Sequence, residues 1–194
     1  MKNRKYIYTP GPVHMYKETL EIGAHQTPYF RNKEFSKVLF ECENTIIELV
    51  NAPRGSKVVF LAASGTAGME AAVIIFLGKK DKAIVVNGGN FGQRFADICS
   101  CHNVAYEEWN ITNDNLENIK NSKISRDITH FLVNAHETSM GLLFDLKAIG
   151  DFCKKHNLLN IVDAISMFVT DEIDMKKHNI DVMIASSHKG LALP

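Results

Sequence analysis

The chain has 194 residues, of which 45% are hydrophobic and 23% are charged, which is enough for one globular domain with a hydrophobic core. Lys and Arg together number 22, as do Asp and Glu, so the formal net charge is +0 and no basic run marks a nucleic-acid surface. No stretch approaches the roughly 18 apolar residues of a membrane span, and the charged N-terminus lacks the apolar segment of a signal peptide. The sequence predicts a soluble cytoplasmic protein without nucleic-acid or membrane partners.

The first predicted elements are a helix, a strand and a second helix. Apolar residues in 35–50 fall on one helical stripe, which predicts an amphipathic helix. The run KVVFLA (57–62) is short, apolar and β-branched, and turn residues flank it, which predicts a buried strand. The stretch TAGMEAAVIIFLGKK (66–80) is helical in composition, with Gly78 as the expected C-cap.

The same alternation continues to the end of the chain. Strands are predicted at 83–87, 104–108, 129–134, 159–163 and 181–186, and helices at 92–101, weakly near 114–121, and at 146–156, the last capped by Asp145. Strands separated by helix-length segments require right-handed crossovers. The predicted fold class is therefore α/β, with a mostly parallel sheet and helices on both faces.

The four cysteines are Cys42, Cys99, Cys101 and Cys153. They form neither a CxxC pair nor a dense disulfide framework, which predicts reduced, mostly buried thiols. A metal site at CSCH (99–102) is the alternative, but the close spacing of its two cysteines is awkward for tetrahedral ligands. We therefore expect no metal.

Residues suited to chemistry follow the predicted strands, at the sheet edge where α/β proteins bind ligands. Ser64, Gly65 and Thr66 begin a helix, where backbone N–H groups and the helix dipole favour a phosphate. The alternative is that Ser64 is only an N-cap, since the stretch matches neither GxxxxGK[ST] nor GxGxxG.

Two ionisable residues end apolar strands. Asp163 follows LNIV, so its carboxylate needs a cation or hydrogen-bond donors, unless it only caps the next segment. Lys189 comes soon after DVMIA, where partial desolvation favours the neutral amine, unless the side chain simply reaches solvent. Because both lie at strand ends of one predicted sheet, the sequence favours a shared site.

These groups, together with the aromatic Phe91 on a glycine-rich loop, indicate a site for pyridoxal 5'-phosphate. Lys189 would form a Schiff base with the cofactor, and Asp163 would keep the ring nitrogen protonated. The turn at 64–66 would bind the phosphate, and Phe91 would stack on the ring.

Six stretches match a known family in chain order: YTPGPVHM, FRNKEF, SGTAGMEAAV, NGGNFGQRF, HETSMGLLFDLKAIGDFCKKHNLLNIVDAIS and IASSHKGLALP. In this order they resemble the class V aminotransferases of the fold-type-I pyridoxal-phosphate-dependent enzymes, in the branch with alanine-glyoxylate, serine-glyoxylate and 2-aminoethylphosphonate-pyruvate aminotransferases. The resemblance implies transfer of an amino group from a small amino acid to a 2-oxo acid such as pyruvate or glyoxylate, by a homodimer.

The resemblance also implies roles for individual residues. Lys189 and Asp163 would be the catalytic residues, and either Thr138 or Ser139 would lie near the phenolic oxygen of the cofactor. His188 stands where the family commonly has a glutamine that helps to bind the phosphate; a histidine can also donate, but its charge varies near neutral pH. Phe30 stands where a histidine often precedes the arginine of FRNKEF, which leaves substrate contacts there undetermined.

Family enzymes continue beyond the lysine into a small C-terminal domain that supplies an arginine for the substrate carboxylate. This chain ends at Pro194, so the resemblance implies an N-terminal arm (1–30) and a cofactor-binding large domain (31–194), with the small domain absent and the substrate site incomplete. The alternatives are a truncated, catalytically incomplete fragment, a class V lyase such as a cysteine desulfurase, and a doubly wound domain that binds a nucleotide or no ligand. A desulfurase needs a mobile cysteine, and no cysteine here lies on an obvious active-site loop.

Overall fold

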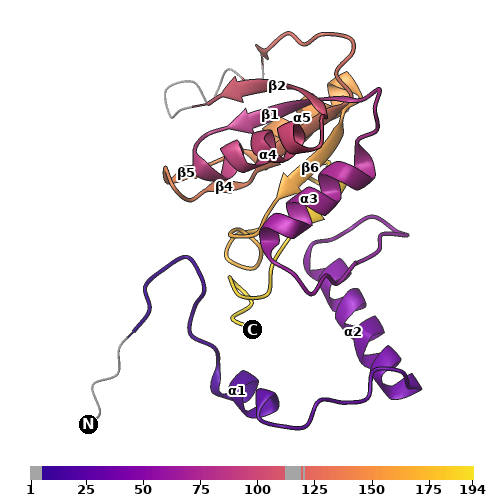
Figure 1. Cartoon of the computed structure of the whole chain (residues 1–194), viewed down its shortest axis with the longest axis vertical. Helices are drawn as coiled ribbons and strands as arrows, with labels where there is room; N and C mark the ends of the chain where they lie inside the picture. Colours follow the sequence, from indigo (N-terminus) through magenta and orange to yellow (C-terminus); the bar gives the residue numbers. More distant parts are fainter. Residues whose placement is uncertain (1–5, 112–118, 120) are drawn as a thin grey trace.

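The centre of the molecule is a five-stranded parallel sheet, seen in a computed structural model that describes residues 6–111, 119 and 121–194 (Figure 1). The strand order is β2-β1-β3-β6-β7, and every pairing is parallel. The strands are β1 (Lys82–Asn87), β2 (Ala105–Asn110), β3 (His130–Asn134), β6 (Leu159–Asp163) and β7 (Val182–Ile184). The predicted mostly parallel α/β sheet is confirmed.

Helices cover both faces of this sheet, as predicted. Helices α3 (Gly65–Phe76) and α4 (Asn90–Cys101) lie on one face, and α5 (Leu146–His156) lies on the other. Successive residues of β1 alternate between the two layers: Val85 packs with the α3 and α4 side chains, whereas Ile84 packs with those of α5. Because both faces of each inner strand are buried, those strands are mostly apolar, with buried polar residues such as Asn160 as exceptions.

Local capping places the ends of the helices. The Asp145 carboxylate accepts a hydrogen bond from the Ala148 amide at 2.9 Å, which confirms Asp145 as the N-cap of α5.

The predicted C-terminal end of α3 at Gly78 was wrong. That helix ends at Phe76, because Leu77 turns to an extended conformation and the Gly78 amide donates to Asp81 at 2.8 Å instead of continuing the helix. The weak helix predicted near 114–121 falls mostly outside the described residues.

The predicted strand at 57–62 is not formed. This segment is apolar and β-branched, but a strand also needs a neighbouring strand to satisfy its backbone groups. None of the five strands of the sheet pairs with it; the amide of Val58 instead donates to the Glu43 carboxylate at 3.3 Å. Val59 is 77% exposed, and Phe60 and Leu61 are each 51% exposed. The composition of this segment therefore favours a strand, but no strand of the sheet pairs with it.

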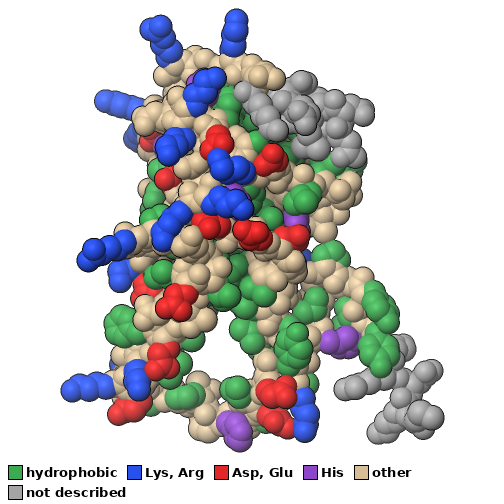
Figure 2. Space-filling view, turned by 180° about the vertical axis from the view of Figure 1, so that it is seen from behind, with side chains coloured by type: hydrophobic (Ala, Val, Ile, Leu, Met, Phe, Trp, Pro, Cys, Tyr) green, Lys and Arg blue, Asp and Glu red, His purple; other side chains and the backbone are tan. Residues whose placement is uncertain are grey.

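The N-terminal part of the chain leaves most of its large apolar side chains exposed. Neither helix α1 (Lys17–Gly23) nor helix α2 (Lys33–Leu49) has a buried residue, and both lie away from the sheet in Figure 1. The predicted helix at 35–50 is thus confirmed, yet Val38, Leu39 and Phe40 on α2 remain exposed. Figure 2 shows an opening between this N-terminal segment and the rest of the molecule.

A short hairpin was not predicted from the sequence. Strands β4 (His136–Glu137) and β5 (Leu142–Leu143) pair antiparallel, and Gly141 between them has a φ of +67°, a conformation that glycine adopts readily. Two residues per strand are too few to show an alternation of polar and apolar side chains. The hairpin matters because it folds the chain after β3 back toward the start of α4.

The cysteines divide equally between core and surface. All four are free; Cys99 and Cys153 are buried, whereas Cys42 and Cys101 are exposed, so the expectation of mostly buried thiols holds for half of them. Burial raises the pKa of the Cys99 thiol to about 11, which makes it a poor nucleophile. Within the described ranges, no cluster of His, Cys, Asp and Glu is placed to hold a metal ion. The helices of these ranges include none long and apolar enough to cross a membrane.

The packing of α5 gives a test of the fold. A Cβ added to Gly150 would overlap the carbonyl oxygen of His178 and lie 2.6 Å from its carbonyl carbon. We expect Gly150→Ala to lower the free energy of unfolding by about 1–3 kcal/mol or more, although alanine normally favours a helix. Gly23→Ala is the control, because nothing lies within 4 Å of its added Cβ, and its effect should stay within about 0.5 kcal/mol. Urea unfolding of both variants measures the difference; equal stabilities would contradict this packing.

Candidate functional site

The candidate site lies where the strand order of the sheet reverses. β1 pairs with β2 on one side and with β3 on the other. After β1 the chain adds β2 at one side of β1 and then crosses to the other side, where it adds β3, β6 and β7 in turn. In open α/β sheets the loops separate at such a point and leave a crevice at the carboxyl ends of the strands. A pocket of about 220 Å³ opens there.

Eight residues that the sequence nominated line this one pocket, whereas Ser139, the alternative to Thr138, does not. They come from several separate segments of the chain: Ser64, Gly65, Thr66, Phe91, Thr138, Asp163, His188 and Lys189. The pocket also contains four residues that the sequence analysis did not single out: Arg94, His136, Ile165 and Ser166. The parallel sheet brings these segments together, because all its strands end at the same edge.

The start of α3 forms one wall of the pocket. Ser64 is the N-cap of this helix, and its hydroxyl accepts a hydrogen bond from the Ala67 amide at 3.3 Å. This capping does not exclude anion binding, because the first amides of a helix have no intrahelical acceptor. Gly65 and Thr66 follow directly and line the pocket, so both functions that the sequence left open are compatible here.

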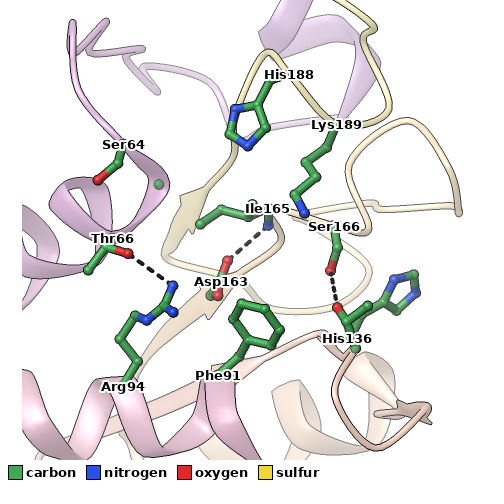
Figure 3. Close-up of a pocket in the computed structure, with 12 residues that line it drawn as sticks. Ser64, Thr66, Phe91, Arg94, His136, Asp163, Ile165, Ser166, His188 and Lys189 are labelled. Carbon is green, nitrogen blue, oxygen red and sulfur yellow. Dashed lines mark hydrogen bonds between the residues drawn. The ribbon is translucent and has the colours of Figure 1, made fainter. Parts of the chain in front are cut away.

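Arg94 connects two walls of the pocket. Its guanidinium donates a hydrogen bond to the Thr66 hydroxyl at 3.0 Å and lies 5.1 Å from the centre of the Phe91 ring (Figure 3). Arg94 comes three residues after Phe91 in the same helix, a spacing that places both side chains on one helix face. That spacing was the signal in the sequence from which Arg94 could have been identified.

Asp163 presents a buried carboxylate to the pocket. It is 6% exposed, and it accepts a hydrogen bond from the Ile165 amide at 2.9 Å. No described lysine, arginine or histidine forms an ion pair with it. Burial raises the pKa of the Asp163 carboxyl to about 6, against the opposing effects of the Ile165 amide and the positive charge of Arg94. This carboxylate is therefore suited to a ligand that brings a cation or a hydrogen-bond donor.

Lys189 points into the pocket and not toward bulk solvent. In Figure 3 its side chain extends toward the loop that carries Ile165 and Ser166. The N-terminal segment passes beside it: a Cβ on Gly11 would overlap Cδ of Lys189 and lie 3.0 Å from its Cε. Gly11 has a φ of +151°, so this close approach also uses a backbone conformation that favours glycine. No local pattern in the sequence indicates this contact, because it joins the two ends of the chain.

The structure distinguishes between Thr138 and Ser139. Thr138 lines the pocket, and its hydroxyl donates to the Ser166 hydroxyl at 3.3 Å. Ser139 is not among the lining residues; its hydroxyl donates to the Glu137 carboxylate at 2.5 Å. His188 lies on the pocket wall between Ser64 and Lys189 in Figure 3.

The groups in the pocket fit pyridoxal 5'-phosphate. Helix amides are available for a phosphate, a buried carboxylate lacks a cationic partner among the described residues, an aromatic ring forms one side, and an amine points inward. A planar cofactor with a phosphate at one end and a basic ring nitrogen at the other can satisfy all of them together.

Comparison with known proteins agrees with this fit. The family model for class V aminotransferases matches residues 13–194. An uncharacterized aminotransferase of Helicobacter pylori is 31% identical over 195 residues, which are 97% of this chain and 51% of that protein. A 2-aminoethylphosphonate–pyruvate transaminase of Vibrio vulnificus is 31% identical over 196 residues, which are 97% of this chain and 53% of that protein. The chain thus spans about half the length of these curated relatives.

Solved structures share the fold. An aspartate aminotransferase of subgroup IV from Thermus thermophilus superposes with a TM-score of 0.88 at 24% identity, covering 98% of this chain and 54% of that one. A pyridoxamine-pyruvate aminotransferase from Mesorhizobium loti superposes with a TM-score of 0.87 at 21% identity, covering 100% and 50%. With the family match across nearly the whole length, the chain belongs to the class V aminotransferases, whose cofactor is pyridoxal 5'-phosphate.

Proposed function

We propose that the chain forms the cofactor-binding part of an aminotransferase that moves an amino group from a small amino acid to a 2-oxo acid such as pyruvate or glyoxylate. The observation that carries the proposal is the convergence of eight nominated residues on one pocket. The names of similar proteins support the class of acceptor, since they include a 2-aminoethylphosphonate–pyruvate transaminase and an alanine–glyoxylate aminotransferase.

The residues nominated from the sequence each have a task in this reaction. When bound, pyridoxal phosphate supplies an aldehyde that bonds to amines and a ring that accepts electrons from the carbon beside that bond. The Lys189 amine would bond to this aldehyde with loss of water, and the same amine, when free, would move the proton at the substrate carbon. The Asp163 carboxylate would accept a hydrogen bond from the ring nitrogen and so favour its protonated form.

The remaining pocket residues bind and orient. The amides at Gly65 and Thr66 and the Ser64 hydroxyl would hold the phosphate at the positive end of α3, and His188 would donate to it as well. Phe91 would stack on the ring. The Thr138 hydroxyl would donate to the phenolic oxygen in place of the Ser166 hydroxyl.

We also propose domain bounds and an oligomeric state for this protein. Residues 31–194 form the cofactor-binding domain, residues 1–30 form an N-terminal arm, and the protein is a cytoplasmic homodimer. Support comes from helices α1 and α2, which bury none of their residues within one chain and expose large apolar side chains such as Phe40. An exposed apolar surface of this kind is typical of a protein interface. Sedimentation analysis at several concentrations tests the dimer.

A cysteine desulfurase or related lyase is disfavoured by the pocket itself. No cysteine is among the residues that line it, and the thiols of Cys99 and Cys153 are buried in the core. Release of sulfide from cysteine by the purified protein would revive that alternative.

The test of cofactor binding is direct. The purified 194-residue chain is mixed with pyridoxal 5'-phosphate, and we expect it to turn yellow and to keep the cofactor after borohydride reduction and dialysis. Mass spectrometry of the digested protein should then locate the cofactor on the peptide that contains Lys189. A colourless protein that retains no cofactor would refute the proposal.

A further inference from the structure

Glu137 is a buried carboxylate that the proposed chemistry does not use. It lies in β4 with an exposed fraction of 0%, and it is not among the pocket-lining residues. A buried charge is costly unless hydrogen bonds surround it, so its presence calls for a structural reason. A signal existed in the sequence: like Asp163, it is an acidic residue just after a buried strand.

Five hydrogen bonds from the described residues meet this carboxylate. One oxygen, Oε2, accepts from the amides of Phe91 at 3.1 Å and Gly92 at 2.9 Å, and from the Asn134 side chain at 3.1 Å. The other, Oε1, accepts from the Ser139 amide at 3.1 Å and the Ser139 hydroxyl at 2.5 Å. All five partners are donors, which matches an acceptor-only carboxylate.

Glu137 acts as the cap of α4 from a distant part of the chain. The N-cap residue of this helix is Gly89, which has no side chain to cap it, so the first amides of α4 need another acceptor. The carboxylate supplies that acceptor at the positive end of the helix. Its position requires the glycine: a Cβ on Gly89 would lie 2.8 Å from Cδ of Glu137 and 2.6 Å from the Ser139 hydroxyl.

The two segments that Glu137 joins each carry a pocket residue. On α4, the amide that Glu137 holds belongs to Phe91 itself, and Gly92 is the next residue. On the chain after β3, Thr138 stands between Glu137 and Ser139 and lines the pocket. A single buried side chain therefore connects the segment that carries Phe91 to the segment that carries Thr138.

We propose that Glu137 is a positioning residue for the cofactor. Through its hydrogen bonds to α4 and to Ser139, it holds the Phe91 ring and the Thr138 hydroxyl in a fixed position relative to each other. The inference rests on the proposed binding of pyridoxal phosphate. Glu137 does not touch the cofactor, so its effect is on the orientation and affinity of the cofactor and not on the bond with Lys189.

Glu137→Gln is the sharpest test, because it keeps the shape of the side chain while removing its negative charge and replacing one acceptor oxygen with an NH₂ donor. A glutamine has one carbonyl oxygen, so in either orientation its NH₂ group faces N–H donors of α4 or of Ser139. We expect the dissociation constant for pyridoxal phosphate to rise about tenfold or more. At saturating cofactor, the visible circular dichroism of the bound ring should change in amplitude, while borohydride still attaches the cofactor to Lys189.

Controls separate this inference from the proposed function. Glu48→Gln, the same change on the exposed part of α2, should leave affinity and dichroism unchanged. If the parent chain binds no cofactor, the proposed function fails; if the parent binds and Glu137→Gln matches it in affinity and dichroism, only the role of Glu137 fails. Should Glu137→Gln not fold, Ser139→Ala decides, since it removes one of the five donors together with the hydroxyl oxygen that accepts from the Asn90 amide at 3.0 Å. A dichroism different from that of the parent would support the inference, and an unchanged dichroism would overturn it.

Discussion

Replacing Lys189 with alanine is expected to reduce the covalent attachment of pyridoxal phosphate after borohydride treatment to background. The side chain points into the pocket and is the only lysine among the lining residues, so no other described amine is placed to bond with the aldehyde there. Reduction converts that bond into a stable amine link, which mass spectrometry detects as an added mass on one peptide.

The Lys189 experiment has a matched control and a clear contrary result. Lys79→Ala removes an exposed lysine and should leave the labelling equal to that of the parent. The Lys189→Ala variant should still bind some cofactor non-covalently, because the start of α3 and Asp163 remain in place. Equal labelling in Lys189→Ala and the parent, or a label on another peptide, would show that the pocket does not act as proposed.

Replacing Asp163 with asparagine is expected to have opposite effects with and without the cofactor. Without the cofactor, burial raises the pKa of this carboxyl from 3.8 to about 6. The folded state therefore holds a proton more tightly than the unfolded state, and folding stability falls as pH rises between about 4 and 6. Well above pH 6 the cost reaches its full value, at most about 3 kcal/mol for a shift of about two pH units. A neutral asparagine side chain at this position carries no such cost.

We therefore expect the cofactor-free Asp163→Asn variant to be more stable than the parent by about 1–3 kcal/mol at pH 8, and nearly equal to it near pH 4. With cofactor the order changes, because asparagine cannot hold the ring nitrogen protonated. Its affinity for pyridoxal phosphate should fall by about 10- to 100-fold or more, as when one member of a buried charged pair is removed. Urea unfolding at both pH values, with and without cofactor, measures each effect.

The Asp163 experiment also has an internal check. Asp97→Asn, a change at an exposed carboxylate on α4, should show neither the gain at pH 8 nor the loss of affinity. A parent chain whose stability does not fall between pH 4 and pH 6 relative to Asp163→Asn would mean that this carboxylate is not buried as the structure has it.

Some features could be predicted from the sequence because they depend on local pattern. The inner strands are mostly apolar and are separated by helix-length segments, and together these features indicate a parallel sheet between two layers of helices. Once the sheet is parallel, its strand ends share one edge, so Asp163 and Lys189 could be expected to lie together although they are far apart in the chain. The helix cap at Asp145 is likewise a local signal.

Other features needed the positions of distant residues. The run at 57–62 has the composition of a strand, but pairing is a property of two segments, and none of the five strands of the sheet pairs with it. The contact between Gly11 and Lys189 joins segments from opposite ends of the chain, and no local pattern announces it.

The sequence by itself determined the fold class, the family and the residues nominated for the pocket, because hydrophobic periodicity and short motifs are read within a few residues. Only the tertiary structure decided that Thr138 and not Ser139 faces the pocket, that Arg94 links Thr66 to the Phe91 ring, and that Glu137 caps α4 from a distant segment. These arrangements depend on directions of side chains across loops, which hydrogen bonds and close packing fix only when the whole sheet has formed.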